Sequence, residues 1–197
     1  MSADLRTMAG LVLAAFALAA CGGSRPSFKN TDVTGADYGK DFALTDHTGK
    51  ARTLADFRGK AVVMFFGYTR CPDVCPTTLA ELKAVKDQLG EDGKRLQVLF
   101  VTVDPERDTQ KLLANYVPAF DPSFLGLYGD SAATARVAKD FRVFYQKSPG
   151  KTQDGYTVDH TAGSYVFDPQ GRLRLFVRHG SAANLAADVR ILLNASG

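Results

Sequence analysis

Two uninterrupted apolar runs mark the centre of the predicted fold. The runs AVVMFFG (61–67) and LQVLFVTV (96–103) are rich in β-branched and aromatic residues, which is typical of strands buried on both faces of a partly parallel sheet. Between them, residues 76–89 place leucine and valine three or four positions apart, and Gly90 follows as a stop signal. The pattern predicts a strand–helix–strand unit with parallel strands.

Weaker patterns on both sides complete the predicted sheet. Residues 42–54 form two strand-like pieces around a turn, where Gly49 can adopt positive φ, and this indicates an N-terminal β-hairpin. The turn at 169–171 separates two more strand-like pieces, which indicates an antiparallel end of the sheet. The remaining predictions are strands at 164–168 and 173–178, helices at 110–117, 132–140 and 182–193, and a polar, turn-rich loop at 145–156. The sum is one α/β domain with a mixed central sheet flanked by helices.

The N-terminus has the pattern of a targeting segment. The apolar stretch from Met8 to Ala20 is well short of the ~20 residues that span a bilayer as a helix, and suits the hydrophobic region of a secretory signal. The sequence Leu-Ala-Ala-Cys at 18–21 resembles a bacterial lipobox, whose cysteine is lipidated after cleavage. A short buried helix with an incidental cysteine is the alternative.

The lipobox interpretation divides the chain into three parts. Residues 1–20 are predicted to be a lipoprotein signal peptide, 21–37 a Gly, Ser and Pro rich tether, and 38–197 the folded domain. The mature protein is then expected at the periplasmic face of a bacterial membrane, anchored by a lipid on Cys21.

Composition narrows the classes of function. With 45% hydrophobic and 23% charged residues among 197, the chain is too apolar to be disordered, and it is neither collagen nor a coiled coil. A net charge of +3 from 24 basic and 21 acidic residues is too balanced to indicate nucleic-acid binding. Of the 3 cysteines, Cys21 is assigned to the lipid, which leaves Cys71 and Cys75. These two are too close in sequence for a disulfide between them to stabilise the fold. We therefore expect them to take part in thiol redox chemistry or metal binding.

The cysteine pair follows the first buried strand, in the sequence GYTRCPDVCP at 67–76. Cys71 and Cys75 each precede a proline, which disfavours helical geometry, so both are predicted on a loop with Pro76 as the first helical residue. The positive end of that helix should favour the thiolate of Cys75. Such a pair either cycles between dithiol and disulfide or binds a soft metal, and spacing alone does not decide.

A histidine ligand would favour metal binding. His47 on the hairpin turn and His179 at a strand end are interpreted as surface residues. His160 directly precedes a predicted strand, at a junction that lies beside the cysteine loop in thioredoxin-type sheets. Two thiolates and one imidazole form a soft donor set suited to copper, and the thiolates leave Cu(I) at −1 and Cu(II) neutral. The alternative is a loop histidine that hydrogen-bonds Asp159 or a backbone carbonyl.

Three segments carry a family resemblance. YTRCPDVCP (68–76), VDPERDT (103–109) and DHTAGS (159–164) resemble the signature segments of the Sco/SenC family, thioredoxin-like copper-binding factors for cytochrome c oxidase assembly. The resemblance implies a thioredoxin-like fold and copper, Cu(I) or Cu(II), as the bound metal. It also implies delivery of copper to, or maintenance of the thiols of, the binuclear copper site in oxidase subunit II, with another periplasmic copper chaperone as a further candidate partner. The implied metal ligands are Cys71, Cys75 and His160.

The acidic segment and the overall activity keep alternatives open. The sequence at Asp104 indicates a cap of the following helix, with Pro105 at its first position. The family resemblance implies instead that Asp104 lies near the metal loop, where it orients a ligand or contacts a partner. Arg107 and Asp108 are interpreted as a local ion pair or cap.

We expect a metal-binding assembly protein and no turnover enzyme. A dedicated extracytoplasmic thiol–disulfide oxidoreductase is the alternative function, and a peroxidase is third.

Overall fold

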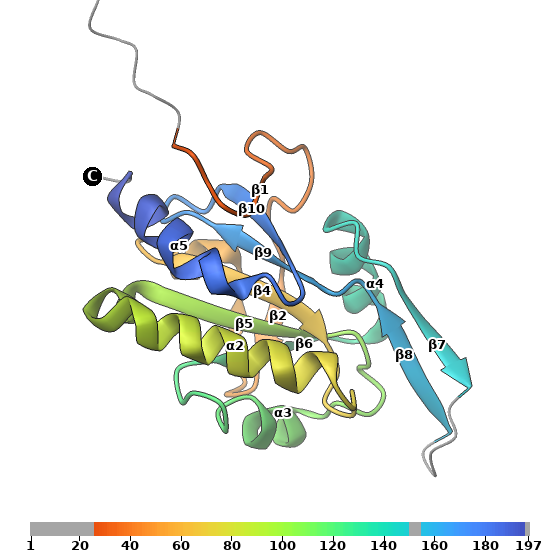
Figure 1. Ribbon diagram of the computed structural model, residues 1–197. Coiled ribbons are helices and arrows are strands. Elements are labelled where there is room, and N and C mark those ends of the chain that lie inside the picture. Colours follow the sequence, from red (N-terminus) through yellow and green to blue (C-terminus); the bar gives the residue numbers. More distant parts are fainter. Residues whose placement is uncertain (1–25, 150–154, 196–197) are drawn as a thin grey trace, which may run out of the picture.

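A mixed sheet forms the centre of the computed structural model, which describes residues 26–149 and 155–195 (Figure 1). In the described part, eight strands join in the order β1-β10-β9-β4-β5-β6-β2-β3, and β7 and β8 form a separate pair. The strands are β1 (Thr31–Asp32), β2 (Leu44–Asp46), β3 (Ala51–Arg52), β4 (Ala61–Gly67), β5 (Leu96–Thr102), β6 (Leu125–Tyr128), β7 (Tyr145–Pro149), β8 (Tyr156–His160), β9 (Gly163–Phe167) and β10 (Leu173–Arg178). The predicted signal peptide and Cys21 lie outside the described residues.

The two apolar runs form the central strands, as predicted. β4 and β5 pair in parallel along their whole length, and every residue of both strands is buried. β6 continues the sheet in parallel beyond β5, whereas on the other side β9 pairs antiparallel with β4 and β10 pairs antiparallel with β9. The N-terminal hairpin, β2 and β3, joins the far edge through β6. The predicted mixed sheet and hairpin are therefore confirmed, although the sequence pattern missed the four-residue strand β6.

Helices cover both faces of this sheet. Successive residues of β4 point to opposite faces, so Phe65 and Phe66 belong to two separate core layers. The ring of Phe66 packs against Phe141, which directly follows α4, while Phe65 packs against Phe100. Figure 1 shows α2 and α5 side by side on one face. The helices are η1 (Leu54–Phe57), α2 (Val74–Leu89), η2 (Gly90–Arg95), α3 (Gln110–Tyr116), α4 (Ser131–Asp140), η3 (Ala182–Asn184) and α5 (Leu185–Asn194).

The predicted loop at 145–156 is wrong in part. Tyr145–Pro149 pairs with Tyr156–His160 as the antiparallel strands β7 and β8, which we call the arm, and which extends away from the central sheet (Figure 1). The side chains of β7 are exposed or half-buried. Because little of this strand faces the core, it needs no apolar alternation, and its polar sequence is typical of a loop.

The stretch assigned to a tether is partly attached to the domain. β1 pairs antiparallel with β10 and adds an edge strand. The buried carboxylate of Asp188 in α5 accepts hydrogen bonds from the backbone N–H groups of Lys29 (2.8 Å) and Asn30 (2.9 Å). The fold thus begins before residue 38, where the sequence pattern placed its start. Among the described residues, the structure has no helix with the length and apolar character needed to cross a membrane.

Candidate metal centre

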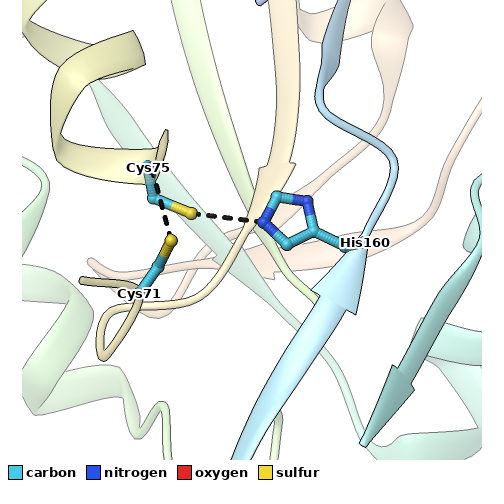
Figure 2. A group of neighbouring side chains, drawn as sticks. All are labelled: Cys71, Cys75 and His160. Atoms are coloured by element: carbon cyan, nitrogen blue, oxygen red, sulfur yellow. Dashed lines mark hydrogen bonds between the residues drawn. The ribbon is translucent and has the colours of Figure 1, made fainter. Parts of the chain in front are cut away.

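The two cysteines lie where β4 passes into α2. Cys71 is half-buried on the loop, while Cys75 is buried in the first turn of α2, which begins at Val74. The prediction that Cys75 lies on the loop and that Pro76 starts the helix is therefore wrong. A proline is tolerated in a first turn because its missing N–H would have no intrahelical acceptor there. The backbone N–H of Cys75 points at the sulfur of Cys71, at 3.4 Å (Figure 2).

The arm brings the third candidate ligand to this pair. His160 ends β8, and its Nε2 lies 3.4 Å from Sγ of Cys75 (Figure 2). One donor atom from each of Cys71, Cys75 and His160 lies within 4.8 Å of the others. The structure thus brings together three residues that the sequence analysis selected, from a loop, a helix and a strand.

The imidazole is oriented for use as a ligand. Nδ1 of His160 lies 3.1 Å from the carbonyl oxygen of Thr161, and a carbonyl can only accept, so Nδ1 carries the proton. The lone pair of a neutral imidazole is then on Nε2, which faces the sulfurs. The rings of Phe65 and Tyr68 contact the imidazole edge to face, each with centroids 6.0 Å apart. The predicted alternative of a carbonyl hydrogen bond is present, and it is compatible with metal binding.

A glycine allows Cys75 to lie this deep. A Cβ atom on Gly67, the last residue of β4, would lie 2.8 Å from the Cys75 sulfur and 2.9 Å from the rings of Phe65 and Phe100. Real Cβ atoms do not approach neighbours so closely, so any side chain at this position would displace the sulfur or the core.

The two thiols differ in acidity, in the opposite sense to the prediction. The hydrogen bond from the Cys75 side chain lowers the pKa of Cys71 to about 4, and the backbone N–H groups of Asp73 and Cys75 lower it further, while burial opposes the shift. Donating that bond raises the pKa of Cys75, and burial raises it further. The helix terminus does stabilise a thiolate, but its amides point at the preceding cysteine, so Cys71 is the anion.

Asp104 lies outside the ligand cluster. Its buried carboxylate accepts hydrogen bonds from Nε of Arg107 and from the hydroxyl of Tyr156, at 2.8 Å. It does not cap α3, because Thr109 is the N-cap residue and accepts from the N–H of Leu112. The predicted Arg107–Asp108 ion pair is wrong too, since Arg107 pairs with Asp104.

Asp108 is a structural residue that sequence reasoning missed. Its buried carboxylate accepts from the N–H (3.0 Å) and hydroxyl (2.6 Å) of Thr69 and from the hydroxyl of Thr102 (2.6 Å). Burial raises the pKa of Asp108. Because Thr69 precedes the cysteines, Asp108 ties the cysteine loop to the end of β5. Thr102, six positions before Asp108, was the available local signal, but the contact with Thr69 spans 39 positions and leaves no local pattern.

The other two histidines lie outside the cluster. Nδ1 of His47 accepts a hydrogen bond from the N–H of Gly126 at 3.0 Å, and burial lowers the pKa of His47. His47 is therefore a connection between the hairpin and β6, which corrects its interpretation as a solvated residue. His179 is exposed as predicted, with Nδ1 3.0 Å from the hydroxyl of Thr78.

The cluster has the chemistry of a soft-metal site. Two sulfurs and an imidazole nitrogen converge, and this donor set favours copper or zinc over hard cations such as Mg²⁺. The same pair of free sulfurs could also exchange with a disulfide, because the thiolate of Cys71 is half-exposed and Cys75 lies behind it.

Known proteins resemble this chain over most of its length. Residues 30–194 match the SCO1/SenC family model. The mitochondrial SCO2 homolog of Bos taurus is 44% identical over 151 residues, which cover 76% of this chain and 56% of that protein. The mitochondrial SCO1 homolog of Homo sapiens is 38% identical, over 77% of this chain and 51% of that protein. The chain therefore spans little more than half the length of these relatives.

Solved structures support the same relationship. The copper-bound ScoI of Bradyrhizobium japonicum is 43% identical, with a TM-score of 0.71 over 80% of this chain and 99% of that one. The apo Sco1 protein of Thermus thermophilus is 42% identical, with a TM-score of 0.75 over 86% of this chain and 99% of that one. These likenesses confirm the predicted thioredoxin-like α/β fold.

Proposed function

Because this chain belongs to the SCO1/SenC family, we propose that it is an extracytoplasmic copper-binding protein that helps to assemble the binuclear copper site of cytochrome c oxidase subunit II. The observation that carries this proposal is the convergence of Cys71, Cys75 and His160, whose donor atoms lie within 4.8 Å of one another. A relative that is 43% identical has been solved with copper bound.

The donor set suits both oxidation states of copper as cargo. Two thiolates satisfy the soft Cu(I) ion, and the imidazole adds the nitrogen donor that Cu(II) prefers. With both thiols deprotonated, the Cu(II) site is neutral and the Cu(I) site carries one negative charge. The elevated pKa of Cys75 implies that copper must displace its proton, so binding should release protons.

Metal stoichiometry and one histidine substitution test the site. The purified chain should hold about one copper per molecule, and His160→Ala should weaken Cu(II) binding at least about tenfold, since loss of an oriented ligand removes more than loss of a supporting contact. His179→Ala is the matched control, because His179 is exposed and lies outside the cluster. Equal Cu(II) affinity in the His160 and His179 variants would rule out the three-ligand site.

Transfer of copper tests the function itself. We expect the copper-loaded protein to pass its metal to the apo copper-binding domain of subunit II under reducing conditions. The transfer is followed by separating the two proteins and measuring copper in each. Retention of copper by the donor, with the acceptor thiols reduced, would contradict delivery and favour the second candidate function below.

That second candidate is a thiol–disulfide oxidoreductase dedicated to the oxidase thiols, and the lowered pKa of Cys71 supports it. The Cys71 thiolate would attack a disulfide of subunit II to form a mixed disulfide. Cys75 would then displace the partner's sulfur, leaving the partner reduced by two electrons and this chain oxidised. Loss of the partner's disulfide, with stoichiometric formation of a Cys71–Cys75 disulfide, would establish this activity.

In the first candidate function, copper delivery, this chain must itself receive copper. Another periplasmic copper chaperone is the candidate that supplies it.

Membrane attachment completes the proposal. We place the protein at the periplasmic face of a bacterial membrane, held by a lipid on Cys21, because residues 18–21 resemble a lipobox. The mature protein should carry a lipid mass on an N-terminal Cys21, and Cys21→Ser should release it from the membrane fraction. An unmodified Cys21 in the mature chain would contradict this placement.

A further inference from the structure

The arm that carries His160 is attached to the body at few places. β7 and β8 form their own two-stranded sheet, and most of their side chains are exposed or half-buried (Figure 1). An isolated two-stranded hairpin is marginally stable in water at best. The position of His160 therefore depends on contacts between the arm and the rest of the domain, which are made by the buried side chain of Val158 and by the segment at 104–107, which follows β5.

Tyr156 makes the central contact at the start of β8. Its hydroxyl donates to Oδ1 of Asp104 at 2.8 Å, and its backbone carbonyl accepts from Nη1 of Arg107 at 3.0 Å. The guanidinium of Arg107 lies 3.6 Å from the centre of the Tyr156 ring, within the range of a cation–π contact. Arg107 also pairs with Asp104, whose side chain is fully buried. These contacts between Asp104, Arg107 and Tyr156 form what we call the latch.

The latch continues to the candidate metal ligand. The Arg107 guanidinium also lies 5.8 Å from the ring of Tyr68, and that ring contacts the imidazole of His160. Nη2 of Arg107 is buried with no hydrogen-bond partner in the described part of the chain, and the guanidinium lies over the ring of Tyr156 and nearer the edge of cation–π range from that of Tyr68. One planar cation thus bridges the arm and the strand end that precedes the cysteines.

A second contact of the arm is exposed and contributes less. Lys147 of β7 pairs with Glu106 at 2.6 Å, and both side chains are about half exposed to solvent. Exposed ion pairs are screened by water and salt, whereas hydrogen bonds to a buried carboxylate cannot be replaced by water without loss. The buried latch therefore contributes more to holding the arm than this ion pair does.

We propose that Tyr156 and Arg107 are positioning residues, which hold the arm so that Nε2 of His160 points at Cys75. The consequence for metal binding rests on the proposed function. Cu(I) can be held by the two sulfurs alone, which do not lie on the arm, whereas Cu(II) depends more on the imidazole. Loosening the latch should therefore reduce Cu(II) affinity selectively.

The variants Tyr156→Phe and Arg107→Lys test this role. Tyr156→Phe removes only the hydroxyl, and Arg107→Lys keeps the charge but loses the planar fork and its stacking. The matched controls are Tyr128→Phe, which removes a tyrosine hydroxyl bonded to Gln110, and Arg52→Lys, which alters an arginine paired with buried Asp46. Both controls lie on the hairpin side of the sheet, away from the arm.

Metal affinity gives the first readout. We expect Cu(II) affinity, measured by chelator competition, to fall about tenfold in both latch variants, the scale found when groups that orient a ligand are removed. Cu(I) affinity should change less than about threefold, and the sulfur-to-Cu(II) absorption band should shift or weaken. Equal losses for both oxidation states, or no loss, would overturn the proposal.

Hydrogen exchange of the metal-free protein gives an independent readout. Backbone amides of 156–160 should exchange faster in the latch variants than in the controls, while those of β4 and β5 should not change. Unchanged exchange in the arm would overturn the proposal, even if copper affinity fell. If the unaltered protein binds no copper, the proposed function fails, but this experiment still decides whether the latch holds the arm.

Discussion

At the scale of single residues, the two sulfurs of the metal centre have different tasks. Cys71 is half-buried and receives the N–H of Cys75, so it is ionised and accessible to a partner. Cys75 is buried against β4, beside His160, and keeps its proton until a metal or a disulfide replaces it. A partner should therefore meet Cys71 first.

Alkylation of the metal-free, reduced protein tests this asymmetry. A pKa of about 4 keeps Cys71 as a thiolate at every pH above that value, so its reaction with iodoacetamide should change less than about twofold between pH 5.5 and 7.5. An ordinary thiol with a pKa near 8.5 would accelerate roughly hundredfold over the same interval. Peptide mapping by mass spectrometry separates Cys71 from Cys75 and Cys21.

The unfolded protein is the control for this measurement, because both thiols should then follow the ordinary pH dependence. Faster reaction of Cys75 than of Cys71 in the folded protein would contradict the assignment. So would a rate at Cys71 that rises about tenfold per pH unit.

At the scale of elements, sequence could predict those parts of the fold whose pattern is local. β4, β5 and α2 were predictable because buried strands and an amphipathic helix have apolar periodicities that can be read within about fifteen residues. The arm was not, because most of its side chains do not face the core, and because Tyr156 lies 52 positions from its acceptor Asp104. The cysteines and His160 could be selected by donor type, but their convergence depends on the arm.

The first segment that the structure describes shows the same limit. Asp188 reads as one polar position in an amphipathic helix, yet it accepts hydrogen bonds from Lys29 and Asn30, about 160 positions earlier. Such a contact leaves no periodicity, so the segment before residue 38 was assigned to the tether. In the fold, this carboxylate fixes the path by which the N-terminal segment reaches the domain.

Replacing this carboxylate should release the segment. Asp188→Ala removes the acceptor of three hydrogen bonds, two from the backbone and one from the Asn30 side chain. We expect the free energy of unfolding to fall by about 2 kcal/mol, near the value of one hydrogen bond to a charged group, because the released donors can reach water. Denaturant titration measures this loss, and amides of 29–32 should exchange faster.

Asp87→Ala is the matched control on the neighbouring helix α2. Asp87 is exposed and pairs with Lys83, so its removal should cost at most about 0.5 kcal/mol. If the Asp188 and Asp87 variants were equally stable, the anchoring role of Asp188 would be wrong.

At the scale of the whole molecule, a bound metal would join parts that the chain connects only distantly. The cysteines lie between β4 and α2, and His160 lies 85 positions beyond Cys75, at the end of the arm. A metal that binds all three residues is a cross-link between the arm and the core. Because this cross-link forms only in the folded protein, metal binding should add directly to stability.

Calorimetry of the full chain tests this coupling. At a free copper concentration about 100 times the dissociation constant, a single site adds about 2.7 kcal/mol, which raises Tm by roughly 5–10 °C for a domain of this size. The shift should grow with copper concentration, and Mg²⁺ should cause none, since hard cations do not favour sulfur ligands. In His160→Ala, the shift should remain with Cu(I), whereas with Cu(II) a tenfold loss of affinity should reduce it by about half, because the sulfurs alone satisfy only the softer ion. A Tm independent of copper would show that binding and folding are uncoupled. If copper raised the Tm of the double variant Cys71→Ser, Cys75→Ser as much as that of the unaltered protein, the copper would be bound at another site.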